Sequence, residues 1–208
     1  PEHDPLNKVT IVPRGQALGF AQFLPEGDRV SETFTKLESQ LSTLFAGLIA
    51  EGLIFGEDKI TTGASSDIHR ATQIARAMVT QWGFSKELGP IFYQNEDGMG
   101  AIKGVSEESQ KLIDVEMRKI IDRNYNRAKQ KLEDNMDILH AMKDALLKYE
   151  TLDRNQIDDL MARRPVGEPS GWNDKPKDEQ PKSDDKIKTD LESETKVEPN
   201  VSDNQADA

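Results

Sequence analysis

The segment TTGASSDIHRATQIARAMVTQWGF, residues 61–84, places one carboxylate, Asp67, in the first turn of a predicted amphipathic helix. An acid in this position most often interacts with the helix dipole, which stabilises the helix by about 0.3 to 1 kcal/mol. However, Asp67 follows a run of small residues and lies beside Ile68 and Ala71 rather than on the charged face. A carboxylate there needs a cation, a metal ion or water as its partner. The residues alone leave both interpretations open.

Other catalytic patterns are missing from the sequence. The three histidines, His3, His69 and His140, are not spaced as i and i+4, so no complete His-Glu-x-x-His zinc motif is present. The chain has no cysteine, which excludes a thiolate nucleophile and a disulfide scaffold. No Gly-x-x-x-x-Gly-Lys phosphate loop occurs, and the segment GMGAIKG lacks the preceding strand of a nucleotide-binding loop. Nucleotide binding by this chain is therefore not supported.

The composition narrows the class of protein. The chain has 208 residues, 35% of them hydrophobic and 31% charged, and a formal net charge of −11. This acidic balance, without a basic face, argues against nucleic-acid binding. No apolar run approaches the roughly 18 to 20 residues that span a bilayer, so we expect the chain to be soluble. It begins at Pro1 rather than Met, which suggests a fragment of a longer protein.

The first elements that must position Asp67 are two strands and a helix. KVTIVPRG and ALGFAQFLPEGD are short β-prone runs, predicted to form a hairpin with one strand at a sheet edge because of Pro13. Apolar residues at helical spacing then predict a helix capped by Ser31 and ending near Gly56. The helix that contains Asp67 is predicted to be capped by Ser65 or Ser66.

Three more helices are predicted downstream. The glycine-rich connection NEDGMGAIKGVSEES precedes a long helix that starts near Ser106 and is broken at residues 134–135. Residues 137–150 and 151–164 predict two shorter helices, the second capped by Thr151. The predicted fold class is mainly α, with a short N-terminal β hairpin.

A composition change at Pro165 divides the chain into a folded part, residues 1–164, and an acidic tail, residues 165–208. The tail has 12 acidic residues and 6 lysines with no apolar periodicity, so we expect it to be disordered. A solvating extension is the favoured role, and binding of a partner is the alternative.

The folded part resembles the membrane-anchored ATP-dependent zinc metalloproteases of the FtsH type. The resemblance is carried by KVTIVPRGQALGFAQFLPEGD, TTGASSDIHRATQIARAMVTQWGFSKELGP, RNYNRAKQKLEDNMDILHAMKDALLKYETL and QIDDLM. It implies that Asp67 is the third zinc ligand. The other two ligands and the general base come from a His-Glu-x-x-His helix expected just upstream of Pro1. A catalytic zinc site of this kind uses three protein ligands and a water.

The resemblance also implies partners and a location. It implies protein substrates, which pair with an edge strand, and a homo-hexamer fused to an ATPase domain outside these residues. Transmembrane segments, also outside this chain, would hold the protease at the cytoplasmic face of the bacterial inner membrane. No nucleic-acid partner is implied.

One segment departs from the family pattern. Where the family reads Gly-Gly-Arg-x-Ala-Glu-Glu, this chain reads AGLIAEG, so Ala46, Leu48 and Gly52 replace the first glycine, the arginine and the second glutamate. Glu51 remains and could hold a zinc-ligating histidine in orientation. The alternative for Glu51 is a solvated or ion-paired helix acid.

Two hypotheses follow for the whole chain. In the first, it is the C-terminal part of a zinc peptidase domain, inactive in isolation. In the second, it is an inactive fragment or relic that acts only as a helical oligomerisation module. The sequence encoded immediately before Pro1 would distinguish them.

Overall fold

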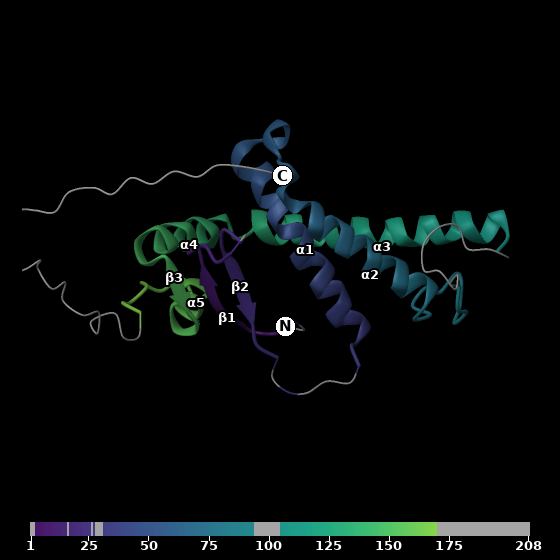
Figure 1. Ribbon diagram of the computed structural model, residues 1–208, viewed down its shortest axis with the longest axis horizontal. Helices are drawn as coiled ribbons and strands as arrows, with labels where there is room; N and C mark the ends of the chain where they lie inside the picture. Colours follow the sequence, from purple (N-terminus) through teal and green to yellow (C-terminus); the bar gives the residue numbers. More distant parts are fainter. Residues whose placement is uncertain (1–2, 16, 26, 28–30, 94–104, 170–208) are drawn as a thin grey trace, which may run out of the picture. The chain divides into compact units, whose positions relative to one another are not determined.

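A computed structural model describes residues 3–15, 17–25, 27, 31–93 and 105–169 of the chain, coloured in Figure 1. The elements in order are β1 (Leu6–Thr10), β2 (Phe20–Phe23), α1 (Phe34–Phe55), η1 (Glu57–Lys59), η2 (Thr62–Ala64), α2 (Ser65–Thr80), α3 (Glu107–Glu133), α4 (Met136–Tyr149), β3 (Thr151–Asp153) and α5 (Arg154–Met161). The predicted fold class, mainly α with a small sheet, is confirmed.

The sheet has three antiparallel strands in the order β2-β1-β3. The two strands of the predicted hairpin are present, and the register pairs Thr10 with Phe20. Gly19 permits this close return, because a Cβ atom there would lie 2.6 Å from the Thr10 carbonyl oxygen. Within the described residues β2 is an edge strand, as expected for one of the pair. Pro13 is not the cause, because it lies beyond the end of β1.

Helices α1, α2 and α3 pack around one apolar core, which we call the helix cluster. Its fully buried side chains include Leu41, Met78 and Val79. Asn124 is also fully buried; its side-chain amide donates to the Ile120 carbonyl at 2.9 Å and accepts from the Ser42 hydroxyl at 3.2 Å. The buried polar group of α3 is therefore paired within the cluster.

The sheet, α4 and α5 form a second core, which we call the sheet cluster. Its buried side chains are Ala145, Tyr149, Leu152, Ile157 and Leu160. The two cores share no side chain. The start of α5 is fixed by side-chain contacts: Asp153 and Gln156 form a reciprocal capping box, and the Gln156 side chain also donates to the Gly167 carbonyl at 2.9 Å.

Several predicted boundaries are confirmed and others are wrong. Ser106 caps α3 and Gly56 ends α1, as predicted. Ser31 does not cap α1, because the Thr33 side chain accepts the Lys36 amide instead. Neither Ser65 nor Ser66 caps α2, because a 3-10 turn precedes the helix and Ala64 holds the cap position.

The last predicted helix also differs. Thr151 does not cap it, because residues Thr151–Asp153 form strand β3 and pair with β1, and Asp153 is the cap. The apolar face of the helix predicted around Asp67 is only partly buried. Ala71 and Ala75 are fully buried, but Ile68 is 42% exposed, and Trp82, just beyond the end of α2, is 46% exposed.

Two predictions lie wholly or mainly outside the described residues. They are the polar connection, of which residues 94–104 are not described, and the tail predicted to be disordered over residues 165–208, of which residues 170–208 are not described. Residues 165–169 are described, and Val166 packs against the sheet cluster. Among the described helices, none is long and apolar enough to cross a membrane.

Candidate metal site

Asp67 lies in the first turn of α2, where the preceding chain makes two tight turns. Thr61 caps η2 by accepting the Gly63 amide on its side chain at 3.2 Å, and α2 begins directly after η2. Asp67 is half-buried, and within the described ranges no group forms a hydrogen bond or ion pair with its carboxylate. The side chain is thus placed at the positive end of the helix dipole, with its oxygens available to a ligand.

Glu51, near the end of α1, binds the loop that leads to Asp67. Its carboxylate accepts the Thr61 backbone amide at 2.9 Å and the Thr61 hydroxyl at 3.1 Å. The chain between them turns at Gly56, whose φ of 95° is unfavourable for residues with a side chain. Glu51 therefore holds the loop six residues before Asp67. This contact brings the two site residues named from the sequence into one region.

The donors present suit one part of a zinc site. A carboxylate oxygen is an ordinary zinc ligand, and Asp67 has no competing partner among the described residues. Among those residues, however, no three histidine, cysteine or acidic side chains converge to hold a metal ion. Residues outside this part of the chain would have to supply the remaining ligands. Glu51 is already engaged by Thr61, so its first evident role is to fix the loop.

In the described part of the chain, none of the three histidines forms a hydrogen bond or ion pair with Asp67. His69 is exposed on α2, and His140 is exposed on α4. His3 is half-buried, because its ring packs on β2 with its centroid 4.5 Å from that of the Phe23 ring.

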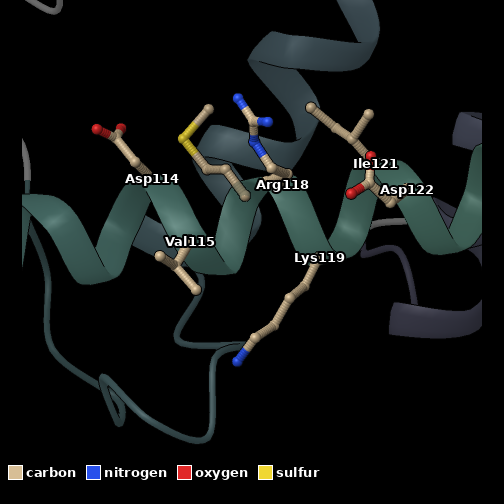
Figure 2. Close-up of a pocket in the computed structure, with 7 residues that line it drawn as sticks. Asp114, Val115, Arg118, Lys119, Ile121 and Asp122 are labelled. Carbon is tan, nitrogen blue, oxygen red and sulfur yellow. The ribbon is translucent and has the colours of Figure 1, made fainter.

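Two hollows lie elsewhere on the described surface. One, of about 410 Å³, separates α1 from α4 and is lined by apolar side chains together with Glu51, His140 and Lys143. The other, of about 680 Å³, lies along α3. Figure 2 shows that its charged groups diverge: Asp114 and Lys119 point to opposite sides of the helix. Groups that diverge in this way do not form a catalytic constellation.

The sequence did not predict that Glu51 pairs with Thr61, nor that Lys36 of α1 pairs with Asp4. Thr61 was recognised only as a small residue, although a threonine before a short turn is typical of a side-chain cap. The burial of Lys36 against Asp4 had a weaker signal in the sequence. That signal was the position of the lysine next to the apolar Leu37 on a helix.

Comparison with known proteins defines the class. The sequence profile described as "Peptidase family M41" matches residues 1–160, which include both strands of the hairpin, Glu51 and Asp67. The chain belongs to this peptidase family.

Individual relatives are bacterial proteases. The chain is 55% identical over 205 residues to an "ATP-dependent zinc metalloprotease FtsH" of Haemophilus influenzae, covering 95% of this chain and 32% of that relative. It is 54% identical over 182 residues to the protein of the same name from Photobacterium profundum, covering 84% of this chain and 26% of the relative. The chain thus spans about a third or less of the length of these relatives.

Proposed function

We propose that this chain is the C-terminal part of the peptidase domain of an ATP-dependent zinc metalloprotease, and that Asp67 is one of its zinc ligands. The observation that carries the proposal is the half-buried Asp67 carboxylate, which has no partner among the described residues and is positioned by the Glu51–Thr61 contact. The family membership and the names of the relatives support the same reaction.

The reaction is hydrolysis of a peptide bond, in which one water is added across the C–N bond to give a carboxylic acid and an amine. Zinc, when bound, would activate water near neutral pH and polarise the peptide carbonyl. Asp67 would hold the metal, and Glu51 would keep the loop before Asp67 in place through Thr61. The general base and two further ligands would come from a His-Glu-x-x-His segment outside this chain.

Strand β2 is the proposed place for an unfolded protein substrate. Within the described residues β2 pairs on one side only, and Ala21 and Gln22 are exposed. An extended polypeptide can add to such an edge through main-chain hydrogen bonds, which recognise the backbone with little sequence preference. This mode suits a protease that degrades many proteins.

The assembly and location are further parts of the proposal. A homo-hexamer, an ATPase domain that delivers unfolded chains and attachment to the cytoplasmic face of the bacterial inner membrane are carried over from the family resemblance. They require segments that these residues do not include. The alternative of an inactive helical oligomerisation module is not favoured, because the family profile covers residues 1–160.

The test uses a fusion protein, in which this chain follows the preceding part of the Haemophilus influenzae relative. Bound zinc and casein hydrolysis are measured for the fusion protein and its Asp67→Ala variant. We expect the variant to lose at least tenfold in zinc affinity and most hydrolysis, with ATP turnover retained. The matched control is Asp58→Ala, which removes an exposed acid of η1 close in sequence. Full zinc content and hydrolysis in Asp67→Ala would reduce Asp67 to a helix-dipole residue.

A further inference from the structure

A buried ion pair links the segment before β1 to the beginning of α1. The Lys36 ammonium lies 3.2 Å from the Asp4 carboxylate, and the two side chains are only 7% and 15% exposed. Lys36 also contacts Glu32 at 3.4 Å, but the Glu32 side chain is 41% exposed. Because a buried lysine is rare without a charged partner, Asp4 is the partner that makes this burial possible.

Asp4 is rigidly connected to the edge strand. On one side of it, the His3 ring packs on Phe23 of β2. On the other side, the Pro5 carbonyl accepts the Leu24 amide at 3.0 Å. A displacement of Asp4 would therefore move the end of β2 with it.

Within the part of the chain that the structure describes, few other contacts between helices and strands tie the two clusters together. Their apolar cores share no side chain, and α1 and α4 face each other across the hollow of about 410 Å³. The clusters meet at the junction of α3 and α4, where the chain passes directly from one helix to the next. The chain also passes from β2 to α1, so the Asp4–Lys36 ion pair is a side-chain tie added to two chain connections, and it fixes the position that those connections leave adjustable.

Helix α1 connects this ion pair with the candidate metal site. Lys36 lies near its first turn and Glu51 near its last, fifteen residues apart, or about 22 Å along a helix. At the far end Glu51 binds Thr61, and thereby the loop before Asp67. One rigid element thus connects the Asp4 segment and β2 at its start with the Asp67 loop at its end.

We infer that Asp4 and Lys36 are positioning residues, which hold the substrate edge of β2 in a fixed place relative to the metal ligand Asp67. The substrate and metal roles in this inference rest on the proposed function, whereas the mechanical tie does not. A misplacement of reacting groups by about 1 Å can cost 100-fold in rate. The pair therefore contributes to the alignment of the scissile bond rather than to binding of substrate or zinc.

The mechanical tie is tested in the 208-residue chain itself. The sequence has no cysteine, so Gln22→Cys on β2 and Thr43→Cys on α1, both exposed, give two unique sites for nitroxide labels. Electron–electron double resonance should show one narrow distance distribution, which broadens in Asp4→Asn and in the double variant Asp4→Asn with Lys36→Met. The control Glu32→Gln removes the more exposed partner of Lys36 and should leave the distribution narrow. An unchanged distribution in the double variant would overturn the inference.

The kinetic consequence is tested in the fusion protein. We expect the double variant to lower kcat at least tenfold, to change KM less than threefold and to keep full zinc content. The double variant is decisive because it removes both charges of the pair, so neither Asp4 nor Lys36 is left charged and buried without the other. If the pair only stabilised the fold, this neutral combination would restore activity, and a kcat within twofold of the unmodified fusion protein would overturn the inference. Failure of the proposed function is distinct, since it would appear as full zinc content in Asp67→Ala.

Discussion

The helix cluster and the sheet cluster build their cores from different kinds of contact. In the helix cluster three long helices interlock, and even a polar side chain, Asn124, is buried and paired across helices. In the sheet cluster a short third strand, β3, contributes Leu152, which is fully buried between the sheet and the last helices. The first core is large and made of elements between residues 34 and 133, and the second joins the two ends of the described chain.

The two clusters also carry different parts of the proposed active site. The candidate ligand Asp67 stands on the helix cluster, and the proposed substrate edge β2 belongs to the sheet cluster. Since the cores share no side chain, catalysis would depend on the few contacts that fix one cluster against the other. The Asp4–Lys36 ion pair is such a contact.

The largest expected effect comes from opening one core at a time. Leu41→Ala and Leu152→Ala each remove a fully buried side chain, which should cost about 2 to 5 kcal/mol. Hydrogen exchange should show faster opening mainly in α1, α2 and α3 for Leu41→Ala, and mainly in β1, α4 and α5 for Leu152→Ala. Equal acceleration in both clusters from either change would mean that the clusters unfold as one unit. Leu147→Ala, at a 70% exposed site on α4, is the control.

A smaller effect, in the opposite direction, is expected at the turn between α4 and β3. Glu150 has a φ of 59°, the left-handed region, and its carbonyl accepts the Ile11 amide at 3.0 Å. Glu150→Gly keeps this carbonyl and relieves the strain, so stability should rise by up to about 1 kcal/mol in denaturant unfolding. Glu150→Ala keeps the Cβ atom and serves as the control. Equal stability of the two variants would show that the backbone carries no strain there.

The smallest expected effect is on the loss of folding stability at low pH. In the helix cluster, hydrogen bonding to Lys119, and then to Ser85, lowers the pKa of Glu116 below its ordinary value of 4.5 despite the opposing effect of burial. In the sheet cluster, the Arg163 guanidinium lowers the pKa of Asp137. A lowered pKa in the folded state gives stability that is present above the ordinary pKa and is lost as the pH falls through the lowered one.

The Glu116→Gln variant should therefore lose less stability than the unmodified chain when the pH is lowered from 6 to about 3. Thermal unfolding across this range measures the difference, and Glu133→Gln, at an exposed site on α3, is the control. A steeper acid loss in Glu116→Gln would contradict the assigned direction of the shift.

Features set by neighbouring residues were predictable from the sequence. The cap of α3 by Ser106 and the end of α1 at Gly56 depend on side chains and backbone freedom within one turn, so local patterns were sufficient. Asp67 was recognised as unusual for the same reason, because its surroundings in the sequence are the first turn of its own helix. The proposal that Asp67 is a zinc ligand came only from the family resemblance.

Features that depend on distant partners were not predictable. Thr151 looked like a helix cap, but Thr10 and Thr151 pair across the sheet and their hydroxyls lie 2.8 Å apart, so the segment became a strand. Long-range pairing of this kind outweighs a weak local preference.

The sequence by itself determined the helical periodicity, the acidic balance and the family, because each of these is written in residue types and their spacing. Only the tertiary structure decided that the Glu51 carboxylate accepts hydrogen bonds from Thr61 and that Lys36 is buried against Asp4. The physical reason is that each contact needs a partner that only folding brings within reach. Glu51 needs the donors of Thr61 across a turn, and Lys36, which on a helix would ordinarily be solvated, is buried only because an opposite charge lies beside it.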